Sequence, residues 1–111
     1  MNNLHIDKDG TKRWYNQKCQ FHREDGPAIE WPNGTKAWYQ HGQCHREDGP
    51  AIEFANGGKK WYQHGKLHRE DGPAIERPNG PNQWFIENQK IDFEFYSYEE
   101  FERKTKLKAF W

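Results

Sequence analysis

Histidine, arginine and acidic residues stand side by side at three places in this sequence, and such neighbours could do acid–base chemistry. The string His-Arg-Glu-Asp-Gly-Pro-Ala-Ile-Glu occurs without a change at residues 22–30, 45–53 and 68–76. An imidazole beside a carboxylate is a common pair for general acid–base catalysis. A catalytic site, however, needs one constellation whose members have different environments, whereas three identical strings receive nearly identical ones. We therefore predict no catalytic residue, and we predict that the chain is not an enzyme.

Metal binding is the second chemistry that these strings suggest. Cys19 lies three residues before His22, and Cys44 directly precedes His45, so that two of the three strings have a thiol near the imidazole. No second Cys-x-x-Cys or His-x₃-His completes a tetrahedral zinc set. We expect no metal and no cofactor. Two cysteines are too few for a disulfide scaffold, and both are predicted to be free thiols.

Partner recognition is the third possibility. Tyrosine, tryptophan and arginine dominate the residues that contribute most to protein–protein binding. The candidate partner-binding residues are one tyrosine and one arginine from each repeat: Tyr15, Tyr39, Tyr62, Arg23, Arg46 and Arg69. In the plainer interpretation, each arginine pairs with an acid of its own or the neighbouring repeat and only shapes the loop. The same tyrosines could stack single-stranded bases, but 17 basic against 17 acidic residues leave no positive excess, so no nucleic acid is expected.

The strings belong to a repeat of 23 residues. Four tryptophans follow this step at intervals of 24, 23 and 23 residues. The extra residue of the first interval lies between Trp14 and His22. The predicted structural residues of the repeat are the tryptophans and the Asp-Gly pairs: Trp14, Trp38, Trp61, Trp84, Asp25, Asp48, Asp71, Gly26, Gly49 and Gly72.

Each repeat has the sequence pattern of two short strands joined by a tight turn. Pro-Ala-Ile-Glu leads into Asn-Gly at Asn56 and Gly57, and Lys-Lys-Trp-Tyr follows. Asn-Gly between two such segments indicates a type I′ hairpin, whose two central residues both need positive φ. After Trp-Tyr, we expect His-Gly to open a loop that runs through His-Arg-Glu-Asp-Gly. Alternation places Ile29 and Trp31 on one face, and Ala28 and Glu30 on the other.

The predicted fold is mainly β: a single-layer antiparallel meander of 23-residue hairpin repeats, with about seven or eight strands, twisted or curved. Residues 1–10 form a partial repeat, residues 11–92 the repeats, and residues 93–111 a final strand and a capping helix, all within one domain. Ser97 and Glu100 have the spacing of a helix capping box. We therefore predict a helix from Tyr98 to about Lys108.

Composition restricts the protein's environment. Six tryptophans, five tyrosines and seven phenylalanines argue for a folded core built from rings, because disordered chains are poor in aromatic residues. The first residues have no apolar segment typical of a secretory signal, and no stretch approaches eighteen apolar residues. We expect a cytoplasmic protein with no membrane insertion.

The repeat resembles the MORN family. The string Trp-Tyr-x-x-Gly-x-x-His-Arg-x-Asp-Gly-Pro-Ala, seen from Trp61 to Ala74, is similar to the MORN-variant repeats of small bacterial and phage proteins. The resemblance extends from Thr11 to about Ile91. It implies a curved single-layer β-sheet and an interaction role, since bacterial members include antitoxin-like proteins and eukaryotic ones act as scaffolds. It supplies no catalytic residue.

The function expected from these observations is docking on another protein. The size and the resemblance favour a phage or bacterial inhibitor or antitoxin that blocks its protein target sterically, in the cytoplasm of a bacterial host. The alternative is a sponge that binds a small ligand or nucleotide through the repeated His-Arg-Glu-Asp loops.

Overall fold

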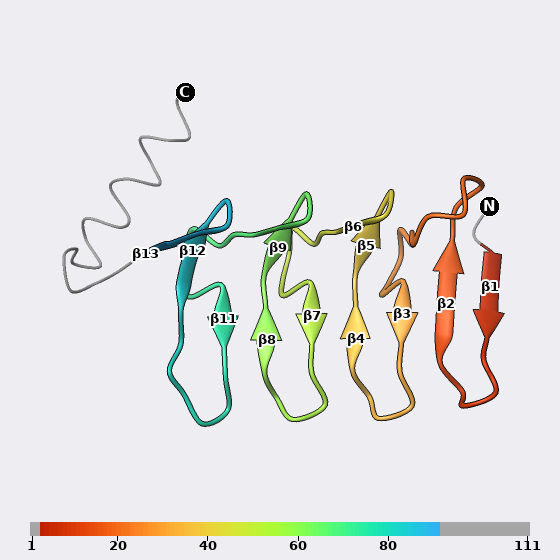
Figure 1. The fold of residues 1–111 in the computed structure, drawn as a ribbon, viewed down its shortest axis with the longest axis horizontal. Coiled ribbons are helices and arrows are strands. Elements are labelled where there is room, and N and C mark those ends of the chain that lie inside the picture. Colours follow the sequence, from red (N-terminus) through yellow and green to blue (C-terminus); the bar gives the residue numbers. More distant parts are fainter. Residues whose placement is uncertain (1–2, 92–111) are drawn as a thin grey trace.

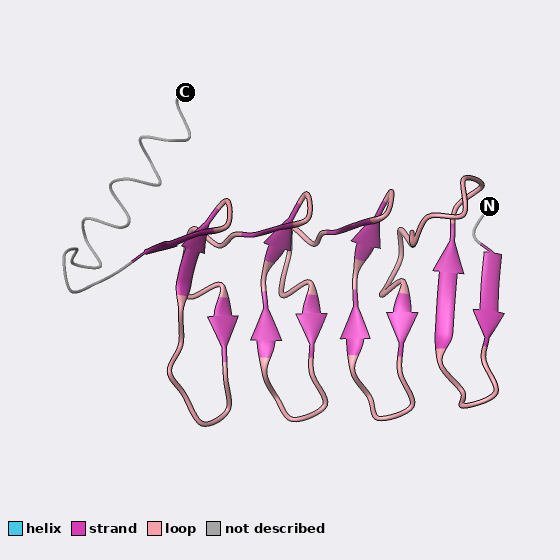
Figure 2. Cartoon of the chain, in the orientation of Figure 1, coloured by secondary structure: helices cyan, strands magenta, loops and turns pink. Residues whose placement is uncertain are grey.

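A computed structural model describes residues 3–91 of the chain, and this range is mainly β. Within it there are thirteen short strands and no helix (Figure 2). The final strand and capping helix predicted for residues 93–111, with the helix from Tyr98 to about Lys108, lie outside the described residues. In the described range, no helix is long and apolar enough to cross a membrane.

Seven strands form one antiparallel sheet in which neighbours along the chain are neighbours in space (Figure 1). The order is β1 (Asn3–Ile6), β2 (Lys12–Tyr15), β3 (Ile29–Glu30), β4 (Lys36–Ala37), β7 (Ile52–Glu53), β8 (Lys59–Lys60) and β11 (Ile75–Glu76). The first and last strands of this order do not pair with each other, so the sheet is open. The predicted antiparallel meander of hairpin repeats is confirmed.

A second row of hairpins, called the edge hairpins below, runs along the sheet at one end of its strands (Figure 1). Each is a separate two-stranded unit: β5 (Tyr39–Gln40) with β6 (Gln43–Cys44), β9 (Tyr62–Gln63) with β10 (Lys66–Leu67), and β12 (Trp84–Ile86) with β13 (Gln89–Ile91). The prediction of a loop directly after Trp-Tyr was therefore wrong. A short hairpin comes first, and the His-Arg-Glu-Asp loop follows it.

The type I′ turn lies in these edge hairpins and not at Asn-Gly. His41 and Gly42 have φ of 51° and 82°, and His64 and Gly65 have 52° and 80°. At the opposite turn, Gly34 alone has positive φ, at 96°, and it donates its N–H to the Trp31 carbonyl at 3.0 Å. This is a three-residue loop that closes on a left-handed glycine. The same loop forms where alanine precedes Asn-Gly, since Gly57 has φ of 94° and donates its N–H to the Phe54 carbonyl at 3.0 Å.

A β-bulge separates the two rows. Ile29 is in register with Ala37, yet the Ala28 N–H also bonds to the Ala37 carbonyl, at 2.8 Å. Two residues thus oppose one, which bends the strand and increases its twist. The strand accordingly ends at Ala37, and Trp38 separates β4 from β5. The next repeat has the same arrangement, where Ala51 bonds to Lys60.

The core alternates large rings with the smallest side chains. Trp14 and Trp38 donate their N–H groups to the carbonyls of Ala28 and Ala51, at 2.8 and 2.7 Å. Residues directly opposite in a sheet share a face, so tryptophans and alanines alternate across the array. Ala28, Ala51 and Ala74 are completely buried. A larger residue there would separate the rings.

Backbone hydrogen bonds fix each loop to the next repeat. The N–H groups of Arg23 and Arg46 bond to the carbonyls of Tyr39 and Tyr62, at 3.3 and 3.1 Å. Gly42 donates to the carbonyl of Phe21, and Gly65 to that of Cys44, both at 2.9 Å. Neighbouring repeats are therefore held in a fixed register, and the three His-Arg-Glu-Asp loops form a regular row.

Candidate functional site

The first loop is organised around the guanidinium of Arg23. Its Nε donates to Asp25 Oδ1 at 3.0 Å, and its Nη1 donates to Glu30 Oε2 at 3.0 Å and to the Pro27 carbonyl at 3.2 Å. Its Cζ lies 3.9 Å from the centre of the Trp14 ring. We call this set of five residues an arginine clamp. A planar guanidinium suits it, because the fork binds oxygens at its edge while its face stacks on an aromatic ring.

The clamp is repeated in the next two loops with nearly the same distances. Arg46 donates to Glu53 at 2.9 Å and lies 3.9 Å above Trp38, and Arg69 donates to Glu76 at 2.7 Å. The remaining partners are Asp48, Pro50, Asp71, Pro73 and Trp61. The six carboxylates and three tryptophans that sequence reasoning treated separately thus belong to one recurring arrangement.

The glycine of each loop makes room for the clamp. A Cβ on Gly26 would lie 3.1 Å from the Arg23 Cζ, and a Cβ on Gly72 would lie 2.8 Å from the Arg69 Cζ. The value for Gly49 is 3.2 Å. All three distances are shorter than ordinary van der Waals contact between carbons. The glycine after each aspartate therefore leaves the space that the arginine side chain occupies.

The histidine of each loop accepts a hydrogen bond from the next repeat. His22 Nδ1 accepts the backbone N–H of His41 at 3.0 Å, and His45 Nδ1 accepts that of His64 at 2.9 Å. His68 does the same for Glu87 at 3.2 Å. Because a backbone N–H can only donate, Nδ1 carries no proton and the proton lies on Nε2. The three donors have positive φ, so this bond supports the type I′ turn.

The second ring nitrogen faces an acid of the same loop. Nε2 lies 3.7 Å from Glu24 in the first loop, 3.5 Å from Glu47 in the second and 3.3 Å from Glu70 in the third. Both nitrogens of each histidine are thus directed at protein groups. No group of three His, Cys, Asp or Glu residues within the described part of the chain could hold a metal ion. The imidazoles act in these contacts as hydrogen-bonding supports between repeats.

The acidic side chains, in contrast, point outward. Glu24 and Asp25 are both 83 % exposed, Glu47 is 81 % exposed, and Asp48 is 86 % exposed. Glu70 and Asp71 continue the row at the third loop. The arginines beneath them are only about one fifth exposed. The loop row, defined as residues 22–26, 45–49 and 68–72, therefore presents carboxylates and covers its cations.

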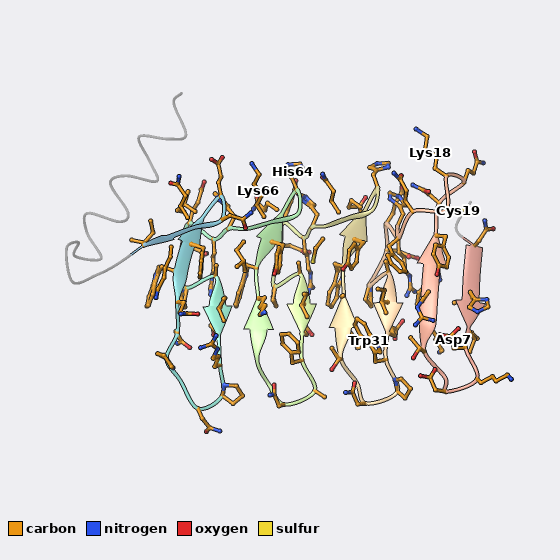
Figure 3. All side chains as sticks on the ribbon, in the orientation of Figure 1. Asp7, Lys18, Cys19, Trp31, His64 and Lys66 are labelled. Carbon is orange, nitrogen blue, oxygen red and sulfur yellow. The ribbon has the colours of Figure 1, made fainter. Side chains whose placement is uncertain are left out.

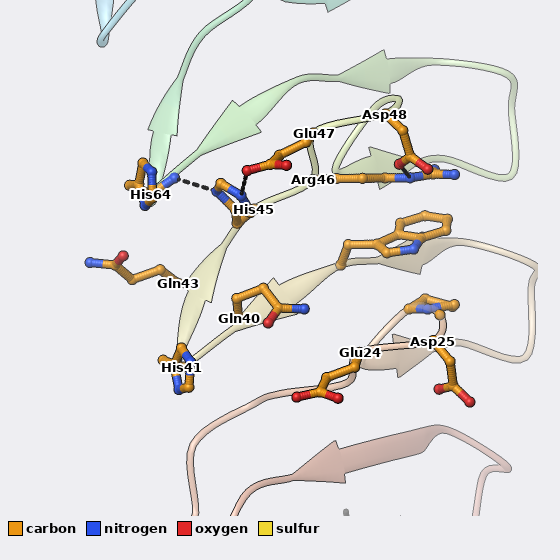
Figure 4. A pocket seen from close by; sticks show the side chains of 13 residues that line it. Glu24, Asp25, Gln40, His41, Gln43, His45, Arg46, Glu47, Asp48 and His64 are labelled. Carbon is orange, nitrogen blue, oxygen red and sulfur yellow. Dashed lines mark hydrogen bonds and ion pairs between the residues drawn. The ribbon is translucent and has the colours of Figure 1, made fainter.

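A groove of about 980 Å³ lies between the first two loops (Figure 4). Glu24 and Asp25 form one wall, and His45, Arg46 and Glu47 belong to the other. Gln40, His41, Gln43 and His64 of the edge hairpins close its end, and Trp38 forms its floor beneath the clamp. The groove is open, with acidic groups on both sides.

The tyrosines follow a separate row among apolar side chains. Tyr15 stacks on Phe21 with ring centres 5.2 Å apart, and Phe21 lies 5.4 Å from Tyr39. Tyr39 is paired with Cys44 across the edge hairpin. Burial raises the pKa of Tyr39 and of Tyr62, and it raises the pKa of the Cys44 thiol to about 12. Tyr15, Tyr39 and Tyr62, the tyrosines among the candidate partner-binding residues, are thus half-buried packing groups.

The other thiol lies in a different environment. Cys19 is exposed, free and in a left-handed conformation with φ of 61°. It lies in a three-residue turn, where the extra residue of the first repeat is accommodated. Lys18 extends from this turn, and His64 and Lys66 belong to the β9–β10 hairpin, whereas Trp31 lies nearer the opposite end of the strands (Figure 3).

Sequence reasoning missed two features of this site. The Arg-to-Glu spacing of seven residues was visible, but a bulged strand was needed to bring Glu30 under Arg23. The donors His41, His64 and Glu87 had no signal apart from the His-Gly turn pattern.

A comparison with protein-family models finds no match, and comparisons with curated proteins and with solved structures find none either.

Proposed function

We propose that this chain is a non-enzymatic, MORN-variant repeat protein that binds a partner protein through its loop row. The observation that carries the proposal is the regular row of outward carboxylates on three identically clamped loops. The clamps hold each loop in one conformation, so little conformational entropy is lost when a partner binds. The groove between the first two loops adds a concave surface beside the acidic residues.

The charges of the row define the chemistry of the partner. Six carboxylates lie at the rim, and the arginines that balance them are covered. A partner with lysines or arginines at a matching spacing would complement this surface and would be guided to it by long-range attraction. We therefore propose a basic protein surface as the target, and an inhibitor or antitoxin as the role, in the cytoplasm of a bacterial host.

The ligand-sponge alternative receives less support from the geometry. A nucleotide phosphate would have to displace Asp25 and Glu30 from Arg23 before that guanidinium could bind it. The same holds for Arg46 and Arg69. The rim would also repel an anion. Catalysis by a single histidine receives less support too, because the hydrogen-bonding arrangement is the same in all three loops.

The proposal is tested by affinity capture from extract of the native host. The loop-row variant combines Glu24→Gln, Glu47→Gln and Glu70→Gln. A matched control raises the net charge equally at exposed positions outside the loops, by Gln17→Lys, Ala55→Lys and Asn79→Lys. We expect one stoichiometric host protein. Its affinity should fall about tenfold or more in the loop-row variant, at roughly 0.5–1 kcal/mol for each lost rim charge.

The control variant should bind that protein as the wild type does. If no protein is recovered in stoichiometric amount, the docking function itself is refuted. If both variants bind equally well, the loop row is not the docking surface. Added nucleotides that occupy the wild type without any protein partner would favour the sponge.

A further inference from the structure

The first strand of the sheet has one side without a neighbour among the described residues. β1 pairs with β2 through Asn3, His5 and Asp7, because the Asp7 N–H bonds to the Thr11 carbonyl and the bonding side alternates along a strand. The peptide groups of Leu4 and Ile6 consequently point toward the open edge. Such a row of donors and acceptors is a template for pairing with another strand.

The β1 edge strand also has large apolar residues at two positions where the equivalent residues of the other repeats are small or charged. Counted back from the turn glycine, Leu4 has the position of Ala28, and Ile6 has the position of Glu30. The register agrees, since Leu4 lies opposite Trp14 and Ile6 lies opposite Lys12, just as Glu30 lies opposite Lys36. The edge strand thus carries two large aliphatic side chains in place of an alanine and a charge.

Both side chains are exposed. Leu4 is 50 % and Ile6 is 55 % accessible, and Phe54 is the other large hydrophobic residue exposed in the described range. Natural sheets commonly protect an edge with a charge that makes pairing unfavourable. Glutamate at the position of Ile6 would be such a charge, and the repeat uses glutamate there three times. The edge lacks this protection.

We propose that β1 pairs antiparallel with β1 of a second copy of this chain. With His5 on the two-fold axis, Leu4 of each copy lies opposite Ile6 of the other, and Asn3 lies opposite Asp7. The four outward peptide groups of each strand then find partners, and the aliphatic side chains cover one another on a single face. No like charges oppose each other in this register, and the two seven-stranded sheets become one continuous sheet.

This dimer is independent of the proposed docking function. It uses the open edge of β1, whereas docking uses the loop row, so either can fail without the other. A head-to-tail arrangement would give open filaments, while the two-fold pairing closes at two copies.

Analytical ultracentrifugation over a range of concentrations tests the proposal. The weight-average mass of the wild type should rise from 13.4 kDa toward twice that value. Ile6→Glu installs the residue that the repeat has at this position, beside Lys12, so that the variant is expected to fold and to remain a monomer. Phe54→Ala, which removes an exposed ring away from the edge, should dimerise as the wild type does.

Disulfide trapping locates the interface. Residues facing each other at a non-hydrogen-bonded antiparallel site have Cα atoms about 4.5 Å apart, within the range of a disulfide. In a Cys19→Ser background, His5→Cys should give a covalent dimer with diamide as oxidant, and Lys8→Cys should not. A wild type that stays at 13.4 kDa at millimolar concentration, an Ile6→Glu variant that dimerises normally, larger species, or trapping at Lys8→Cys alone would each overturn the proposal.

Discussion

Replacement of Arg46 by lysine tests whether the loop arginines stabilise the fold or are held ready for a partner. Lysine keeps the charge but loses the planar fork, and it cannot bind Glu53 and the Pro50 carbonyl while stacking on Trp38. If the clamp is structural, Arg46→Lys should destabilise the isolated protein. If the arginine serves only to bind a partner, the change should lower the free energy of unfolding no more than an ordinary surface substitution does, within about 0.5 kcal/mol.

The expected magnitude follows from the individual contacts. Stacking of the guanidinium on Trp38 is worth about 1 kcal/mol at a partly covered site. The hydrogen bond to the Pro50 carbonyl contributes about 1 kcal/mol, and the pair with the half-exposed Glu53 up to about 1 kcal/mol. The pair with Asp48 adds little because that carboxylate is 86 % exposed. We expect a loss of about 2–3 kcal/mol.

Urea denaturation followed by tryptophan fluorescence measures this loss without the ionic screening that guanidinium would add. Arg77→Lys is the matched control, because Arg77 is exposed and lies outside the clamps. A double-mutant cycle with Glu53→Gln isolates the ion pair. Equal unfolding free energies for Arg46→Lys and Arg77→Lys would refute the structural role of the clamp.

Three further predictions concern the packing around the loops. Burial raises the pKa of Cys44 from 9.0 to about 12, so the free energy of unfolding should be constant below pH 9 and fall above it, by up to about 4 kcal/mol at pH 12. Urea titrations of Cys44→Leu should show a smaller alkaline fall; an unchanged profile contradicts this. Gly72→Ala should destabilise by about 1–3 kcal/mol and more than Gly49→Ala, since its Cβ would lie closer to the loop arginine; equal melting temperatures for the two would count against it. His45→Phe leaves the His64 N–H without its acceptor and should cost about 1–3 kcal/mol in chemical denaturation, whereas a loss below 0.5 kcal/mol would exclude that role.

The repeat period and the hairpins could be predicted from sequence because they depend on local signals. Tryptophans at a constant step and Pro-Asn-Gly turns each indicate structure within a few residues. The type of turn was not predictable, because Asn-Gly alone suggests type I′, whereas a three-residue loop forms both after Pro32 and after Ala55.

The division of each repeat into two hairpins could not be predicted in the same way. It depends on the bulge at Ala28, where two residues oppose Ala37, and no local pattern marks a bulge at an alanine. The bulge redirects the chain after Trp38 and allows His41 to turn back toward the imidazole of His22. The pairing of Arg23 with acids of its own repeat agrees with the plainer interpretation of the sequence, whereas its stacking on Trp14 had no spacing signal.

The identical strings can now be divided into positions that the fold uses and positions that it leaves available. In the first string His22 bonds to the next repeat, Arg23 forms the clamp, and Ala28 is fully buried. Glu24 differs from them: its contact in the described structure is a 3.7 Å approach to the histidine, and it is 83 % exposed. This acid recurs in all three strings and makes few contacts in the first loop, so it is available to the partner that we propose. The neutralised glutamate variant is therefore the most direct test of function, because it should fold as the wild type does and fail only in binding.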